Sequence, residues 1–205
     1  MTSGLPAQHL RIATEDDETI VDLTPLQGLW TVEQYLAITD QSRRLLEYVD
    51  GTIEVLPMPT DRHQVISQAL FIALHAYIYP RGGIVLYAPL RLRIRAGKFR
   101  EPDALLLQRR DDPRRQNRYW LGADLVVEIV SPDDPERDTV VKRADYAEAG
   151  IPEYWIVAPD AERVIVLTLQ DGVYHEAGVY QQGDQIRSVL LPELSIPVQA
   201  IFAAQ

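Results

Sequence analysis

The sequence predicts an α/β or α+β fold with one central mixed β-sheet, flanking helices and added β-hairpins. Segments with the two-residue alternation of strands are interleaved along the chain with segments that have the periodicity of helices. Two Asp-Gly pairs, at residues 50–51 and 171–172, indicate hairpin turns. With 205 residues, of which 46% are hydrophobic, the chain can bury the core of one domain.

The N-terminal part of the chain predicts an arm followed by a short helix. Residues 1–28 mix Pro, Gly and a cluster of acidic side chains, which predicts a flexible N-terminal arm. We expect a single domain over 29–205. Thr31 and Gln34 form a capping box, so a helix should begin there and run to about residue 38.

A hairpin, a long helix and an alternating strand should come next. The hairpin covers 45–56 around the first Asp-Gly pair. Asp61 is the predicted N-cap of an amphipathic helix, which Pro80 ends. Leucine or isoleucine then alternates with arginine over 90–95, as in a half-exposed strand.

The second half of the chain predicts a sheet with one more helix. Residues 104–107 and 125–130 are apolar runs typical of buried strands. Residues 131–133 should cap a helix that runs to about Ala149, with Gly150 at its C′ position. The remaining extended segments are predicted at 153–157, 164–169, 173–180 and near 186–191.

Composition excludes several classes of function. The chain has no cysteine, which excludes disulfides, thiolate zinc sites, iron–sulfur clusters and a cysteine nucleophile. The formal net charge of −10 argues against a protein that simply coats nucleic acid. The longest nearly apolar stretch, residues 69–79, is far shorter than the ~20 residues of a membrane span. We therefore expect a cytoplasmic protein with no membrane partner.

Glu128 is the most informative residue, because four apolar residues surround it in the run 126–130. A carboxylate there is costly to bury unless a cation or hydrogen-bond donors compensate it. It could belong to an active site, or it could pair with an internal arginine or cap a loop.

Asp103 and Lys142 complete a candidate site. Asp103 begins an apolar strand just after Pro102, and two carboxylates on neighbouring strands could hold Mg²⁺. A surface turn is the alternative for Asp103 alone. Lys142 is one of only two lysines and shares a predicted helix face with Asp138 and Tyr146. It could stabilise developing charge, or it could form an exposed ion pair of small value.

The order Pro102-Asp103, Glu128, Lys142 resembles the active site of the PD-(D/E)XK nucleases. A longer ordered series resembles the Uma-two family of restriction-endonuclease-like proteins, which are common in bacteria and above all in cyanobacteria. The series comprises residues 46–51, 63–64, 101–103, 124–132, Asp138, Lys142, Tyr146 and 150–157.

This resemblance implies a restriction-endonuclease-like core and assigns roles within it. Asp103 and Glu128 would be the Mg²⁺ (or Mn²⁺) ligands, with Glu47 as a further acidic ligand. Lys142 would replace the lysine of Glu-x-Lys, because Val130 stands at that position. His63 would contact the phosphate or the leaving group, although it could also be polar surface.

The implied function is that of a magnesium-dependent endonuclease that hydrolyses phosphodiester bonds of nucleic acid, with DNA as the expected substrate. The alternative is a catalytically silent binding or assembly module that keeps the nuclease fold. The resemblance is compatible with a homodimer and does not fix the oligomeric state.

Basic residues are concentrated in one part of the chain. Residues 81–118 contain 11 basic and 4 acidic side chains. Such a segment could face nucleic acid, or it could be a solvated surface that balances acidic neighbours. The candidate phosphate-binding arginines are Arg91, Arg93, Arg95, Arg114 and Arg115.

Overall fold

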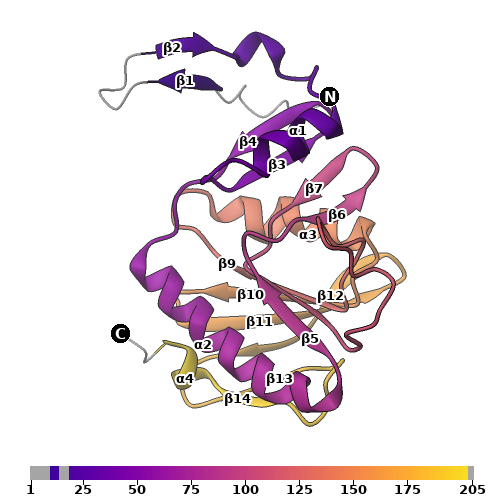
Figure 1. The fold of residues 1–205 in the computed structure, drawn as a ribbon. Helices are drawn as coiled ribbons and strands as arrows, with labels where there is room; N and C mark the ends of the chain where they lie inside the picture. The colour runs from indigo at the N-terminus through magenta and orange to yellow at the C-terminus, as the bar shows by residue number, and fades with distance from the viewer. Residues whose placement is uncertain (1–9, 14–18, 203–205) are drawn as a thin grey trace. The chain divides into compact units, whose positions relative to one another are not determined.

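The computed structural model describes residues 10–13 and 19–202. The chain divides into two compact units, which Figure 1 shows together with the element labels. The N-terminal unit contains residues up to 58 together with 95–100. The sheet unit contains residues 59–94 and 101–205. Each unit is described separately.

The sheet unit contains a six-stranded mixed sheet. Its strands are β5 (Ile84–Tyr87), β8 (Ala104–Leu107), β9 (Leu125–Ile129), β10 (Glu153–Ala158), β11 (Arg163–Gln170) and β12 (Val173–Tyr180). They follow the order β12-β11-β10-β9-β8-β5. β9 and β10 are parallel, and the other neighbours are antiparallel. The predicted fold class, a central mixed sheet with flanking helices, is confirmed.

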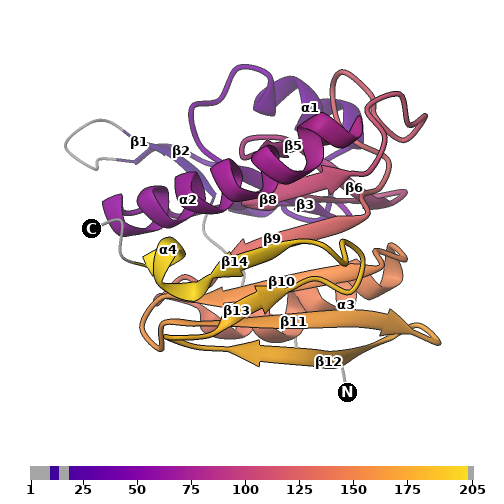
Figure 2. The same ribbon diagram turned by 90° about the horizontal axis from the view of Figure 1, so that it is seen from below.

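Helices cover both faces of this sheet. They are α2 (Asp61–Ile78), the 3₁₀-helix η2 (Tyr79–Arg81), the π-helix η3 (Arg137–Val141), α3 (Lys142–Glu148) and α4 (Val198–Phe202). Figure 2 shows α2 and α4 on one side of the sheet and α3 on the other. Within residues 10–13 and 19–202, none of the helices combines the length and the hydropathy that a membrane span requires.

The alternation of β9 decides which side chains face which helix layer. Leu125, Val127 and Ile129 pack in the core that contains the apolar face of α2. Val126 packs in the opposite core, together with Tyr146 of α3. Glu128 has the parity of Val126, so its side chain points to the α3 side of the sheet.

Both helix starts in this unit differ from the predicted ones. The N-cap of α2 is Thr60 rather than Asp61, because the Thr60 hydroxyl accepts the amide of His63 at 3.3 Å. Asp61 instead lies in the first turn, where its carboxylate interacts favourably with the helix dipole. The next helix begins after Asp134, whose carboxylate accepts the Arg137 amide at 3.2 Å, and not at residues 131–133.

The N-terminal unit is a smaller antiparallel assembly. It contains β1 (Arg11–Ala13), β2 (Thr19–Asp22), the 3₁₀-helix η1 (Thr24–Leu26), α1 (Val32–Thr39), β3 (Leu46–Val49), β4 (Thr52–Val55) and β7 (Lys98–Arg100). The Thr31 capping box is confirmed. So is the hairpin turn, where Asp50 and Gly51 both have positive φ. The acidic cluster at 15–18, on which the prediction of an arm depended, lies outside the described residues.

The strand β6 (Leu92–Arg95) confirms the predicted alternation, since Leu92 and Ile94 are buried, whereas Arg93 and Arg95 are partly exposed. Trp120 lies beside it in a parallel bridge to Leu92.

The predicted extended segment near 186–191 is wrong beyond residue 187. Two short strands, β13 (Gln185–Arg187) and β14 (Ser195–Pro197), pair with each other, and the chain after β13 turns around a buried carboxylate. Glu153 of β10, only 1% exposed, accepts the amides of Val189 and Leu190, each at 2.8 Å. Its other oxygen accepts the Ser188 hydroxyl and the Trp155 indole, each at 2.7 Å.

We predict that Glu153→Gln lowers the free energy of unfolding by about 2–3 kcal/mol, because an amide nitrogen would replace an oxygen that accepts buried N–H groups. Urea unfolding followed by circular dichroism measures the change. Glu176→Gln, at an exposed position of β12, is the matched control and should change stability by less than about 0.5 kcal/mol. Equal stability of both variants would contradict the structural role of Glu153.

Candidate active site

The carboxylate of Glu128 is held by two side chains of α3. The residue is 2% exposed. Lys142 Nζ donates to Glu128 Oε2 at 2.8 Å, and the Tyr146 hydroxyl donates to Oε1. The buried charge is therefore compensated by a lysine and a phenol, and not by an internal arginine.

Asp138, Lys142 and Tyr146 share one helix face, as their spacing predicts. Lys142 Nζ lies 3.2 Å from Asp138 Oδ1, and each of these side chains is 5% exposed. The alternative of an exposed surface ion pair is therefore wrong. The Tyr154 hydroxyl donates to the Asp138 carbonyl at 2.7 Å, which fixes the π-helical turn against β10.

Asp103 lies where the pairing of β8 and β9 ends. The last paired residues are Ala104 and Val127, so a continued register would place Asp103 opposite Glu128 and then Pro102 opposite Ile129. The Asp103 carboxylate accepts the Ile129 amide at 2.7 Å instead. Asp103 therefore lies directly before β8, which is the neighbour of the strand that carries Glu128.

His63 connects the first turn of α2 to Asp103. Its Nε2 lies 3.2 Å from Asp103 Oδ1. Burial lowers the pKa of His63, but the hydrogen bond and charge of Asp103, together with the charge of Asp138, raise it above its ordinary value of 6.5. His63 Nδ1 is buried and has no hydrogen-bond partner within residues 10–13 and 19–202.

The cations of the cluster compensate its buried carboxylates only in part, so the ionised forms of these carboxylates are disfavoured. Burial raises the pKa of Glu128 to about 8, and the charges of Asp103 and Asp138 add to the effect although Lys142 opposes it. Burial likewise raises the pKa of Asp138, against the effect of Lys142. An additional positive charge at the cluster would therefore be favourable.

The donor chemistry fits a hard divalent cation. Asp103 and Glu128 offer carboxylate oxygens, which Mg²⁺ prefers as ligands. The part of the chain that the structure describes contains no group of three or more His, Asp or Glu side chains arranged to hold a metal ion. The candidate protein ligands within the sheet unit are thus two carboxylates, and other oxygen ligands would complete the coordination.

Comparisons with known proteins agree with this architecture. The family model Uma2, described as "Putative restriction endonuclease", matches residues 32–199. The chain belongs to the Uma2 family. A search of the curated proteins finds no match.

One solved structure similar to this Uma2 chain is the crystal structure of "a putative nuclease belonging to DUF820" from Anabaena variabilis ATCC 29413. The two have a TM-score of 0.71 and 21% sequence identity, and the match covers 85% of this chain and 98% of that chain. At this identity, the likeness shows a common fold.

Glu47, the further acidic ligand expected in this Uma2 chain, lies in the N-terminal unit. It is fully buried, and Arg100 Nη1 donates to it at 2.6 Å and to Glu54 at 3.3 Å. Arg100 on β7 therefore compensates the charge of this buried carboxylate. Its role as a metal ligand stays a prediction.

The candidate phosphate-binding arginines fall into two groups. Arg95 forms a two-point ion pair with Asp50, with both distances 2.7 Å. Arg114 pairs with Asp112 at 2.8 Å and with Asp124 at 2.7 Å. Their charges are compensated by carboxylates, whereas Arg115 donates to the carbonyl of Arg110. Arg91 and Arg93 flank the Leu92 bridge to Trp120, and their role in binding phosphate stays a prediction.

Two contributors were missed by sequence reasoning. Tyr154 is a buried aromatic residue whose hydroxyl also donates to the Asp138 carbonyl. Arg100 is the partner of Glu47, and no local sequence pattern indicated this pairing.

We predict that Lys142→Met lowers the free energy of unfolding by about 3–5 kcal/mol, because it leaves Glu128 and Asp138 without the cation that contacts both. Equilibrium urea unfolding in metal-free buffer measures the change. The double variant Lys142→Met/Glu128→Gln should recover part of the loss, since one uncompensated charge is removed. A double variant no more stable than Lys142→Met would contradict the coupling.

Proposed function

We propose that this Uma2 chain is a metal-dependent endonuclease that hydrolyses phosphodiester bonds of nucleic acid with Mg²⁺ or Mn²⁺, and that DNA is its substrate. The observation that supports the proposal best is the pair Asp103 and Glu128 at the ends of neighbouring strands, with Lys142 bound to Glu128 at 2.8 Å. Membership of a family described as restriction endonucleases supports the same reaction class.

In this proposal, Asp103 and Glu128 hold the metal ion. Bound there, the ion would supply Lewis-acid stabilisation of the scissile phosphate and make an attacking water more acidic. Glu47 is a further ligand in the proposal, by its resemblance to an acidic residue of related nucleases.

The other residues orient these carboxylates. Tyr146 fixes one oxygen of Glu128 while Lys142 binds the other. Lys142 also carries the positive charge that would stabilise the pentacovalent transition state electrostatically. His63 and the Ile129 amide each hold one oxygen of Asp103, so the carboxylate is oriented before any substrate arrives.

We predict that the chain nicks or linearises supercoiled plasmid in Mg²⁺ or Mn²⁺, and that EDTA stops the reaction. Asp103→Asn and Glu128→Gln should each lower the rate at least about 100-fold, because metal binding contributes several kcal/mol to transition-state stabilisation. Agarose gel analysis of plasmid topology measures the rate. Asp171→Asn, in an exposed hairpin turn that asparagine also tolerates, should leave the rate unchanged.

Cleavage that survives both carboxylate substitutions would overturn the assignment of the site. A folded protein without cleavage under any divalent metal would favour the alternative, a nuclease-fold module that binds or assembles without catalysis.

We also predict that the folded protein binds Mn²⁺ in calorimetric titration and that Asp103→Asn weakens this binding about tenfold or more, since a charged oxygen ligand is lost. Asp171→Asn again serves as the control. Mn²⁺ affinity unchanged by Asp103→Asn would show that the ion binds elsewhere.

A further inference from the structure

Ring side chains form a row along α2 and the short η2 turn that follows it. The row leads from the middle of α2 toward its C-terminal end, whereas the polar cluster of Asp103 and Glu128 lies near its N-terminal end. Phe71, His75 and Tyr79 follow one another at a spacing of four residues, which places them on one helix face. The centroids of Phe71 and His75 are 5.5 Å apart. Those of His75 and Tyr79 are 4.9 Å apart, with ring planes at 22°. From residue 71 to residue 79 the helix rises about 12 Å.

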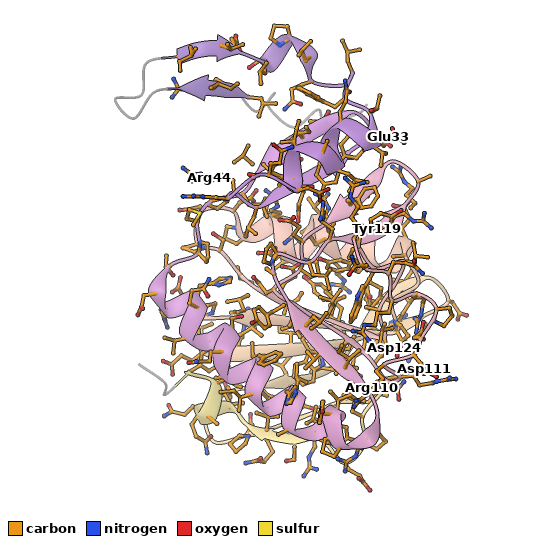
Figure 3. All side chains as sticks on the ribbon, in the orientation of Figure 1. Glu33, Arg44, Arg110, Asp111, Tyr119 and Asp124 are labelled. Atoms are coloured by element: carbon orange, nitrogen blue, oxygen red, sulfur yellow. The ribbon has the colours of Figure 1, made fainter. Side chains whose placement is uncertain are left out.

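Groups from outside α2 extend the row at both of its ends. At one end, Tyr87 of β5 meets Phe71 edge-on at 4.9 Å. At the other, the Arg110 guanidinium lies 4.7 Å from the centre of the Tyr79 ring. Figure 3 shows Arg110 beside the C-terminal end of α2. Five planar groups thus form one continuous series, which we call the aromatic row: Tyr87, Phe71, His75, Tyr79 and Arg110.

Solvent reaches the ends of the aromatic row. Tyr79 and Tyr87 are each 54% exposed, whereas the core of this side of the sheet is completed by Ile66, Leu70 and Leu74 of α2. The two tyrosines are therefore not required to fill the interior. β5, which carries Tyr87, is also the edge strand of the six-stranded sheet.

Uncompensated positive charge lies at the Tyr79 end. The Arg110 guanidinium donates to the carbonyls of Tyr79 and Gly82, and that of Arg115 donates to the Arg110 carbonyl. Across residues 10–13 and 19–202, no carboxylate lies within ion-pair distance of either one. Neighbouring Arg109 differs, because it pairs with Asp111 at 2.9 Å.

The other end of the aromatic row lies beside the candidate metal ligand. Tyr87 is opposite Ala104 in the β5–β8 register. The next residue, Ala88, donates its amide to the Asp103 carbonyl at 3.3 Å. A ligand that followed the row from Arg110 would therefore arrive at the strand end that carries Asp103.

We infer that the aromatic row binds single-stranded nucleic acid, with a base stacked on Tyr87 and with phosphates near Arg115 and near Arg110, whose guanidinium lies over the Tyr79 ring. This inference rests on the proposed nuclease function and names its substrate class. Exposed rings with adjacent cations bind unstacked bases, whereas a duplex keeps its base faces covered. A second copy of the chain is a poorer occupant, because a two-fold contact would bring the same arginines together.

Fluorescence anisotropy with a labelled oligothymidylate of about 20 nucleotides tests the inference, in EDTA so that no cleavage occurs. Tyr87→Ala should weaken binding roughly five- to 100-fold, the loss expected for one stacked base. Tyr79→Ala should also weaken binding, because Arg110 loses the ring against which it lies. Tyr79→Phe and Tyr87→Phe keep the rings and should bind as the parent does. A duplex of equal length should bind more weakly and respond little to the alanine substitutions.

Two outcomes would overturn the inference: alanine variants that bind the oligonucleotide as tightly as the parent, or a parent that does not bind it. A shift from dimer to monomer in analytical ultracentrifugation, with binding unchanged, would instead make the aromatic row a contact between copies and would also overturn it.

Cleavage of the same labelled single-stranded oligonucleotide in Mg²⁺ or Mn²⁺ distinguishes this failure from failure of the proposed function. Cleavage that requires Asp103 but is unaffected by the tyrosine substitutions would support the nuclease proposal and contradict the role of the aromatic row. Oligonucleotide binding that requires the tyrosine rings, without any cleavage, would support the role of the aromatic row and contradict the nuclease proposal.

Discussion

The burial of the Glu128 carboxylate constrains the arrangement of the sheet unit. A charge that is 2% exposed costs several kcal/mol to desolvate unless its partners have good geometry. Both partners, Lys142 and Tyr146, come from α3, one helical turn apart. The helix must therefore lie against the face of β9 to which Glu128 points, with its register fixed to within one residue. The alternation of β9, which sends Val127 to α2 and Glu128 to α3, is what makes a helix on each face necessary.

The same polar cluster joins elements that are distant in sequence. The Asp103 carboxylate accepts a hydrogen bond from the Ile129 amide at the point where Pro102 interrupts the strand pairing. His63, in the first turn of α2, contacts the other oxygen of Asp103. The π-helical turn over 137–141 places the Asp138 carboxylate beside the Lys142 ammonium group. Such turns occur frequently at functional sites. These contacts orient the carboxylates but leave the cluster short of positive charge. A cation-binding site requires carboxylates that are already oriented and whose charge is not yet fully compensated before the cation binds.

The sequence was sufficient to predict features that depend on local chemistry. The Thr31 capping box, the Asp50-Gly51 turn and the buried strand around Glu128 each follow from a few adjacent residues. Features set by tertiary contacts were missed. The exact N-caps depended on which of several adjacent oxygen-bearing residues met the free amides, and the turn after β13 depended on Glu153, more than 30 residues earlier. Glu128 was predictable as a residue with buried partners, because burying a carboxylate demands compensation, and the resemblance to the Uma-two family indicated which residues would lie near it. The pairing of Glu47 with Arg100 was not predictable, since it joins strands over 50 residues apart.

The distribution of charge also changes how the net value of −10 bears on a polyanionic ligand. Several arginines that looked like a phosphate-binding surface are used within the fold: Arg95 on Asp50, and Arg114 on Asp112 and Asp124. Their charge cannot attract phosphate without the loss of these pairs. Counterion release by many free cations, the usual source of affinity for nucleic acid, is therefore weak in this chain. Affinity must come from interactions that do not scale with net charge, and stacking on exposed rings and inner-sphere contact through a bound cation are two such interactions. Both are local, so an acidic chain can engage a nucleic acid at one strand end without coating it.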